Sequence, residues 1–233
     1  STSPSVSPTL AVSASPSAAP TVTMMTCRSF GDPHITTFGG NKCDLMELGV
    51  LPLVELPSMR VQGYHCPTVA GGPTSGNVAV VLLAGTDLIM VVGSTASVNG
   101  QTVAQGTSTV GGYAFSVSTA KVVVRLSDGS SLTSRRRNSN QMKSGARATA
   151  RHAPLEHTQK TPVPPPCAGY FQDVTITAPL AMQQQLTNNP ASACAKELNN
   201  VIPRLTASDR LFPAATVQSL EATCGAIQAS PVS

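Results

Sequence analysis

The feature that most constrains the fold is a succession of short β-prone runs, separated by turn signals, between Phe30 and Thr133. The runs are rich in Val and Leu, and glycine- or serine-containing pairs divide them. Asn99-Gly100 and Asp128-Gly129 are typical of tight β-hairpins. Many short strands at regular spacing predict an all-β fold, an antiparallel β-sandwich. The clearest runs are Asn77 to Ala84, Asp87 to Val92, Tyr113 to Val117 and Lys121 to Leu126.

The first 26 residues differ from this pattern, because they are almost entirely Ser, Thr, Pro, Ala and Val. Such a segment buries too little apolar surface to offset the entropy of ordering it. Residues 1–26 are therefore expected to form a linker or stalk. In a secreted protein this composition is also typical of an O-glycosylated stalk, and an unmodified linker is the alternative.

A second interruption spans residues 134–166 and ends in Pro162-Val163-Pro164-Pro165-Pro166. Between 135 and 160 it holds seven Lys and Arg against one Glu, a net charge of about +6 in a chain of +4. We expect a basic, Pro-rich, disordered insertion. Its cations are candidates for binding polyanions such as sulfated glycans, and a solvated linker is the alternative. The candidate residues are Arg135, Arg136, Arg137, Lys143, Arg147 and Arg151.

The composition changes again after Cys167. A last strand is expected from Phe171 to Thr177, and residues 178–233 are expected to form a small helical, cysteine-containing tail. Helix signals cover Leu180 to Leu186, Ala191 to Asn200 and Ala215 to Thr223. Gly225 is expected to follow the end of the last helix.

Six cysteines form an even set that allows three disulfides in 15 connectivities. No Cys-x-x-Cys pair occurs, which argues against a zinc site or a thioredoxin-like motif. A disulfide framework in a secreted or cell-surface protein fits best, and six buried thiols in a reducing compartment are the alternative. The set is Cys27, Cys43, Cys66, Cys167, Cys194 and Cys224.

The segment from Cys27 to Gly40 combines a cysteine, a Gly-Asp-Pro-His turn and a Thr-Phe-Gly strand end. It resembles the opening of a von Willebrand factor type D (VWD) domain, and Ser97 to Val103 resembles the central hairpin of that family. The resemblance implies a VWD-like β domain over residues 27–177. It implies extracellular structure, adhesion or assembly, with other extracellular proteins or the chain itself as partners. It also implies the pair Cys27–Cys167, after which Cys43–Cys66 and Cys194–Cys224 would be local closures.

The resemblance carries two chemical implications. Some domains with this turn cleave themselves at Asp-Pro, which would make Asp32 the reacting residue at the Pro33 bond and His34 a possible proton donor. An intact structural turn is the alternative. Calcium is a possible cofactor, with Asp32 and Asp173 as ligands and Asn41 and Asp44 as neighbours, although two or three carboxylates fall short of six to eight oxygens.

No enzyme motif such as HExxH, GxSxG or a P-loop occurs in the chain. We therefore expect an interaction module rather than an enzyme, and a metal-dependent hydrolase around His34 and His65 is a minor alternative. The basic segment lacks interleaved aromatic residues, which argues against nucleic acid as a partner. No apolar run approaches the roughly 20 residues that span a bilayer, so no membrane span is expected. The leading alternative function is a secreted polyanion-binding module that uses residues 135–151.

Overall fold

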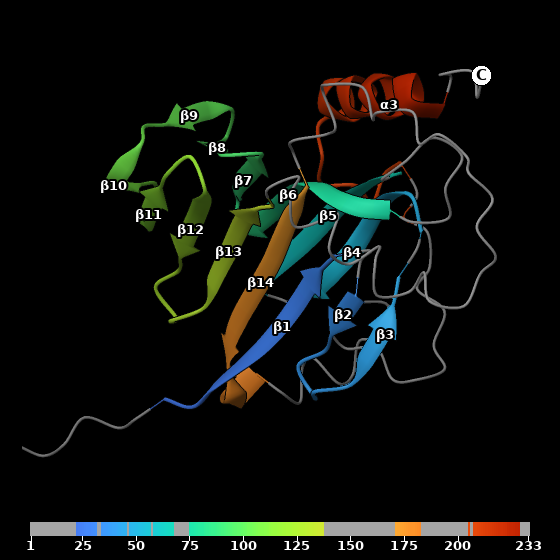
Figure 1. Cartoon of the computed structure of the whole chain (residues 1–233). Coiled ribbons are helices and arrows are strands. Elements are labelled where there is room, and N and C mark those ends of the chain that lie inside the picture. The colour runs from blue at the N-terminus through green and yellow to red at the C-terminus, as the bar shows by residue number, and fades with distance from the viewer. Residues whose placement is uncertain are drawn as a thin grey trace, which may run out of the picture.

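The computed structural model describes residues 22–31, 34–45, 47–56, 58–67, 75–137, 171–182, 205 and 207–228. These residues form two antiparallel sheets, a short 3-10 turn and one α-helix (Figure 1). The all-β prediction, with a small helical tail, is confirmed.

The larger sheet has eight strands in the order β10-β11-β12-β13-β14-β1-β2-β3. A meander from β10 to β13 lies on one side of β14, and β1 to β3 lie on the other (Figure 1). Its strands are β1 (Met24–Phe30), β2 (His34–Thr36), β3 (Lys42–Asp44), β10 (Gly106–Val110), β11 (Tyr113–Val117), β12 (Lys121–Arg125), β13 (Ser131–Arg136) and β14 (Gln172–Pro179).

The smaller sheet has six strands that follow one another in sequence, from β4 to β9. Bulges interrupt the pairing of β4 with β5 near Pro52 and that of β5 with β6 near His65. Its strands are β4 (Gly49–Glu55), β5 (Met59–Pro67), β6 (Ser75–Ala84), β7 (Asp87–Val92), β8 (Thr95–Val98) and β9 (Gln101–Val103).

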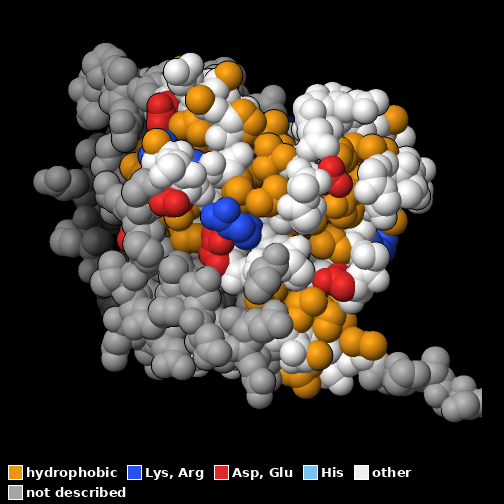
Figure 2. All heavy atoms as spheres, turned by 180° about the vertical axis from the view of Figure 1, so that it is seen from behind, with side chains coloured by type: hydrophobic (Ala, Val, Ile, Leu, Met, Phe, Trp, Pro, Cys, Tyr) orange, Lys and Arg blue, Asp and Glu red, His pale blue; other side chains and the backbone are white. Residues whose placement is uncertain are grey.

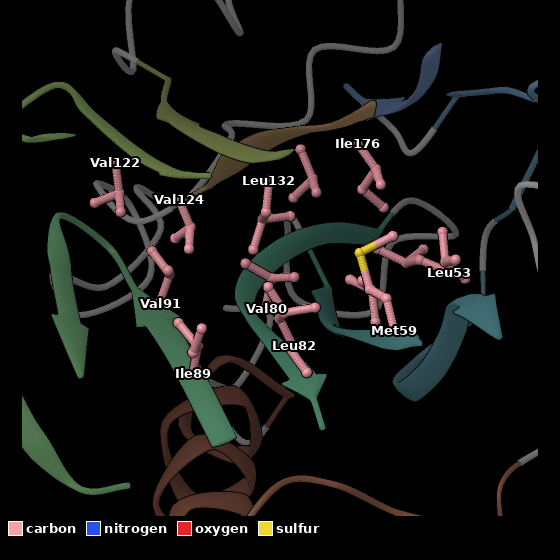
Figure 3. Packing of buried hydrophobic residues seen from close by; sticks show 14 of the residues in the cluster. Leu53, Met59, Val80, Leu82, Ile89, Val91, Val122, Val124, Leu132 and Ile176 are labelled. Atoms are coloured by element: carbon pink, nitrogen blue, oxygen red, sulfur yellow. The ribbon is translucent and has the colours of Figure 1, made fainter. Parts of the chain in front are cut away.

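The main core lies between the two sheets. Alternate residues of each strand face it, because successive side chains of a strand point to opposite faces. Leu132 and Ile176 of the larger sheet face Val80 and Leu82 of the smaller one (Figure 3). All four side chains are buried. Side chains from the Val- and Leu-rich runs that the sequence predicts as strands thus form the contact surface between the two sheets.

Helix α3 (Ala214–Gln228) covers the outer face of the six-stranded sheet (Figure 3). The Gln62 side chain binds the segment that precedes the helix. Its Nε2 donates to the Asp209 carbonyl at 2.8 Å, and its Oε1 accepts from the Leu211 amide at 2.7 Å. The Tyr64 and Phe212 rings meet edge to face, 6.1 Å apart. These contacts attach the C-terminal segment to β5 as a third layer.

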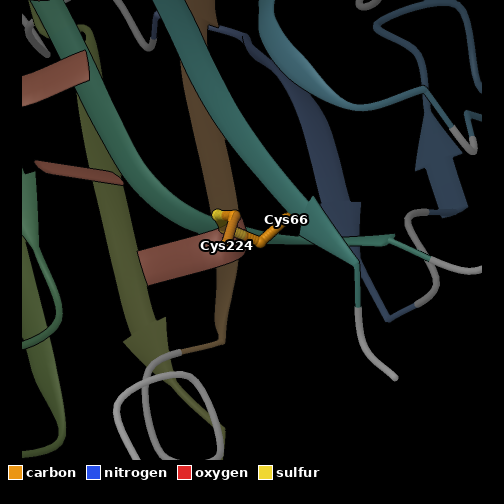
Figure 4. The surroundings of a disulfide bond; sticks show 2 residues. All are labelled: Cys66 and Cys224. Carbon is orange, nitrogen blue, oxygen red and sulfur yellow. A yellow bond between two sulfur atoms is a disulfide. The ribbon is translucent and has the colours of Figure 1, made fainter. Parts of the chain in front are cut away.

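A disulfide between Cys66 at the end of β5 and Cys224 of α3 closes the same layer (Figure 4). The two cysteines are 158 residues apart in sequence, and both are buried. The disulfide therefore joins the middle of the chain to its last described helix.

Hairpin signals in the sequence are confirmed. Asn99 and Gly100 link β8 to β9 with φ of 50° and 84°, the left-handed region that a two-residue turn of this kind requires. The side-chain Oδ1 of Asn99 also accepts from the Leu88 amide at 2.8 Å, which fixes the turn against β7.

Several predicted limits need correction. Met24 to Thr26 belong to β1 rather than to a linker, and Ser134 to Arg136 continue β13 rather than opening an insertion. Helix α3 runs through Gly225 to Gln228 instead of stopping before it. After β14 a single turn of 3-10 helix, η2 (Leu180–Met182), begins where a longer helix was expected. Residues 1–21, 138–170 and 183–204 lie outside the described part.

Hydrophobic side chains also reach the surface. Figure 2 shows one side of the molecule, where they form a broad patch with isolated acidic and basic groups among them. On the outer face of the six-stranded sheet, Leu88, Met90 and Val92 are only partly buried against the layer that α3 forms. Over the described ranges, the structure holds no helix with the length and hydropathy of a transmembrane segment.

Candidate functional site

The Gly-Asp-Pro-His turn connects β1 to β2, but Asp32 and Pro33 lie outside the described residues. His34 is described: its Nδ1 lies 2.6 Å from Asp44 Oδ1, and both side chains are more than half exposed. The His34 ring also lies 5.8 Å from that of Phe30. The predicted cleavage at Asp32–Pro33 stays a prediction, and Asp44 is the group that orients His34.

Asp173, the second predicted calcium ligand, is occupied by other partners. Its Oδ1 accepts from the Gly31 amide at 3.3 Å and lies 3.4 Å from Arg137 Nε. The Arg137 guanidinium beside the Asp173 carboxylate competes with a metal cation for it. Asp44, the predicted neighbour of the site, is paired with His34. Among the described residues no group of three or more His, Cys, Asp or Glu side chains converges. Because Asp32 lies outside the described residues, the calcium site stays a prediction.

The outer face of the eight-stranded sheet gathers positive charge. Side chains at alternate positions of its strands point away from the core, and the strand register aligns them in rows. One row runs Lys121–Arg135–Asp173 across β12, β13 and β14, and continues through Phe30 and His34 to Asp44. A neighbouring row runs Thr133–Thr175–Arg28–Thr36–Lys42.

Five exposed cations lie on this surface, which we call the basic face; it carries only two carboxylates among the described residues, Asp44 and Asp173. The cations are Arg28, Lys42, Lys121, Arg125 and Arg135. Like charges at this density favour an anionic partner.

A cleft of about 490 Å³ opens on the basic face. Arg28, Lys121 and Arg135 line it, together with Phe30 and Asp173. The cleft therefore combines three cations with an aromatic ring and a carboxylate. We call it the outer-face cleft.

The predicted polyanion-binding residues are divided by the structure. Arg135 lies in the outer-face cleft, and Arg136 and Arg137 follow it at the end of β13, whereas Lys143, Arg147 and Arg151 lie outside the described residues. Sequence reasoning missed Arg28 and Lys121, which are lone charges in strands far apart in the chain. Strand alternation could have placed each on an outer face, but only the register brings them together.

His65 does not share a site with His34. It is buried in the interior beside Asn77 and the Glu47 carbonyl, and burial lowers the pKa of its imidazole to about 4. Asn77 in turn donates to Ser29 Oγ at 2.7 Å. The predicted hydrolase pair is therefore wrong in its geometry: one histidine faces solvent beside Asp44, and the other is held neutral in the core.

The cysteine pairs implied by the family resemblance are partly overturned. Cys66 is bonded to Cys224, so the pairs Cys43–Cys66 and Cys194–Cys224 are wrong. Cys27 is disulfide-bonded and buried in β1. Because Cys167 lies outside the described residues, as does Cys194, the Cys27–Cys167 pair stays a prediction.

Comparison of the chain with models of known protein families gives no match, and comparison with curated proteins gives none either. The resemblance to VWD domains therefore rests on the residues around the Gly-Asp-Pro-His turn and on the hairpin segment from Ser97 to Val103.

Proposed function

We propose that this chain is an extracellular interaction module, structural or adhesive, which binds a polyanionic partner through its basic face and turns over no substrate. The observation that carries the proposal is the placement of five exposed cations on one face of the eight-stranded sheet. Clustered Lys and Arg attract polyanions at long range and release their counterions on contact.

The disulfide supports the extracellular part of this proposal. Cys66–Cys224 is buried and joins two layers of the fold, as structural disulfides do in proteins of oxidising compartments. Since it forms within one chain, these two cysteines stabilise the module rather than link it to a partner. Assembly with other copies, which the VWD resemblance implies, would have to use other surfaces or cysteines.

A sulfated polysaccharide is the partner class that the proposal favours. Retention of the purified chain on an immobilised sulfated polysaccharide tests it, with a neutral polysaccharide matrix as control. We expect retention at low salt and elution as the salt concentration rises, because surface charge contacts are screened. Arg125→Gln and Lys42→Gln together should elute earlier than the native chain. Equal passage through both matrices at low salt would contradict the proposal.

A further inference from the structure

We propose that the outer-face cleft is a subsite for an acidic sugar unit, sulfated or uronic, within a longer glycan. This inference rests on the proposed function and narrows it. It assigns recognition to the residues of one cleft rather than to the charge of the whole basic face.

The three cations of the cleft lie on both sides of β14, with β12 and β13 on one side and β1 on the other. Lys121 lies directly beside Arg135 in the register of β12 and β13. Arg28 approaches from the opposite side, beside Thr175 of β14. Arg135 lies opposite Asp173 of β14 and Arg28 lies opposite Thr175, two residues further along, so two strand spacings and this offset put their backbones roughly 12 Å apart. Long side chains at that separation can converge on the anionic groups of one small ligand.

The other lining residues favour a sugar over a simple anion. Asp173 places a carboxylate among the cations, and carboxylates accept hydrogen bonds from sugar hydroxyls but repel sulfate or phosphate. Its Oδ1 is already bound to Gly31 and Arg137, which holds the carboxylate in position. The Thr133 and Thr175 hydroxyls add groups that both donate and accept.

The Phe30 ring gives the cleft an apolar surface beside its charges. It is half-buried and faces the same side as Arg28, two residues before it in β1. A sugar ring can lay its C–H face on such a ring, and an inorganic anion gains nothing from it. The cleft volume of about 490 Å³ lies in the range of small-ligand pockets, roughly 300–1,000 Å³.

Titration of a fully sulfated disaccharide, followed by NMR and calorimetry, tests the subsite. Lys121→Gln has a matched control in Arg125→Gln, since both residues are exposed on the outer face of β12 and both changes remove one charge. We expect Lys121→Gln, Arg28→Gln and Arg135→Gln each to weaken binding by about tenfold, as for loss of a charge-assisted hydrogen bond. Arg125→Gln should change it less than about twofold, because that charge lies outside the cleft.

Phe30→Ala removes the ring without changing the net charge, and we expect it to weaken disaccharide binding while retention on the sulfated polymer persists. Phe30→Leu, with thermal unfolding of every variant, controls for loss of fold. An unsulfated uronate disaccharide and inorganic sulfate serve as further probes, and a preference for one disaccharide tells whether sulfate or carboxylate is recognised.

Three outcomes distinguish the cleft proposal, the assignment of a sugar as its ligand and the proposed function. If the polymer is retained but Lys121→Gln and Arg125→Gln weaken binding equally, the cleft proposal is overturned and the proposed function stands. If inorganic sulfate competes as well as either disaccharide, the site is a plain anion site and the sugar assignment is overturned. If the polymer is not retained at all, the proposed function itself fails.

Discussion

Asn77 of β6 donates a 2.7 Å hydrogen bond to the hydroxyl of Ser29 on β1, and so joins the two sheets through their buried interior. Both side chains are almost fully buried. A second polar link lies nearby in the fold: Gln172 of β14 accepts from Ser134 and donates to the carbonyls of Val78 and Gly93. The sandwich therefore holds its sheets together with directed bonds as well as with aliphatic packing.

Ser29→Ala should lower the free energy of unfolding by about 1–3 kcal/mol, because it leaves the Asn77 amide buried without this acceptor. Urea unfolding measures the change. Ser131→Ala is the control: it removes the 2.6 Å contact between the Ser131 and Thr177 hydroxyls, which is only partly buried. An equal loss in the two variants would argue against a special contribution from the cross-sheet bond.

His65 predicts a dependence of stability on pH. The pKa of its imidazole falls from 6.5 to about 4 in the folded chain, chiefly because burial disfavours the charged form. The unfolded chain then binds the proton first, so stability is fully present above about pH 6.5 and falls as the pH drops toward 4, by about 3 kcal/mol in total.

Urea unfolding at pH 7.5 and pH 4.5 checks this dependence on the native chain and on His65→Gln. The variant should lose less stability on acidification than the native chain, even if it is less stable at both values. His34→Gln serves as the control for removing a histidine side chain from the surface, since His34 is exposed. Parallel losses in the native chain and His65→Gln would assign the effect to other groups.

The Cys66–Cys224 disulfide should contribute about 2–5 kcal/mol to stability, since it closes a long loop in the unfolded chain. Cys66→Ser, Cys224→Ser and the double variant should all unfold at similar, lower urea concentrations. Hydrogen exchange should show that the amides of α3 lose more protection than those of β7. If the double variant is as stable as the native chain, the disulfide adds nothing to the docking of the helix.

Gly76 lies so close to Phe171 that a Cβ atom at residue 76 would overlap the ring. Gly76→Ala should therefore cost about 1–3 kcal/mol, because the ring or the strand must shift in a packed interior. Adding Phe171→Leu should recover part of the loss, measured as a coupling between the two changes. Gly39→Ala is the control, since its added Cβ would meet only ordinary contacts.

Local signals made the fold predictable. Asp87 to Val92 and Tyr113 to Val117 were predicted to the residue, because runs of β-branched, aliphatic or aromatic residues next to glycine turns indicate a strand without distant partners. The pairing of β14 with both β13 and β1 was not predictable, because it joins segments remote in sequence and depends on the packing of the whole sandwich.

The candidate site was less predictable for the same reason. Arg135 stood out within a run of arginines, but Arg28 and Lys121 are isolated in the sequence and reach one cleft only through the pairing of the four strands β12, β13, β14 and β1. The docking of α3 was missed because Cys66 has no local signal for Cys224 as its partner. Gly225 was read as a helix stop, yet α3 continues past it in the folded chain.

The position of β14 also determines the order in which the molecule can be completed. Within the described part of the eight-stranded sheet, β14 alone borders both the group β1–β3 and the meander β10–β13. During synthesis these two groups of strands have no shared hydrogen-bonded neighbour until β14, which ends at Pro179, has been added to the chain. Closure of this sheet is therefore a late event for the growing chain, and a truncation before residue 172 would leave the edges of β1 and β13 exposed to pairing with other molecules.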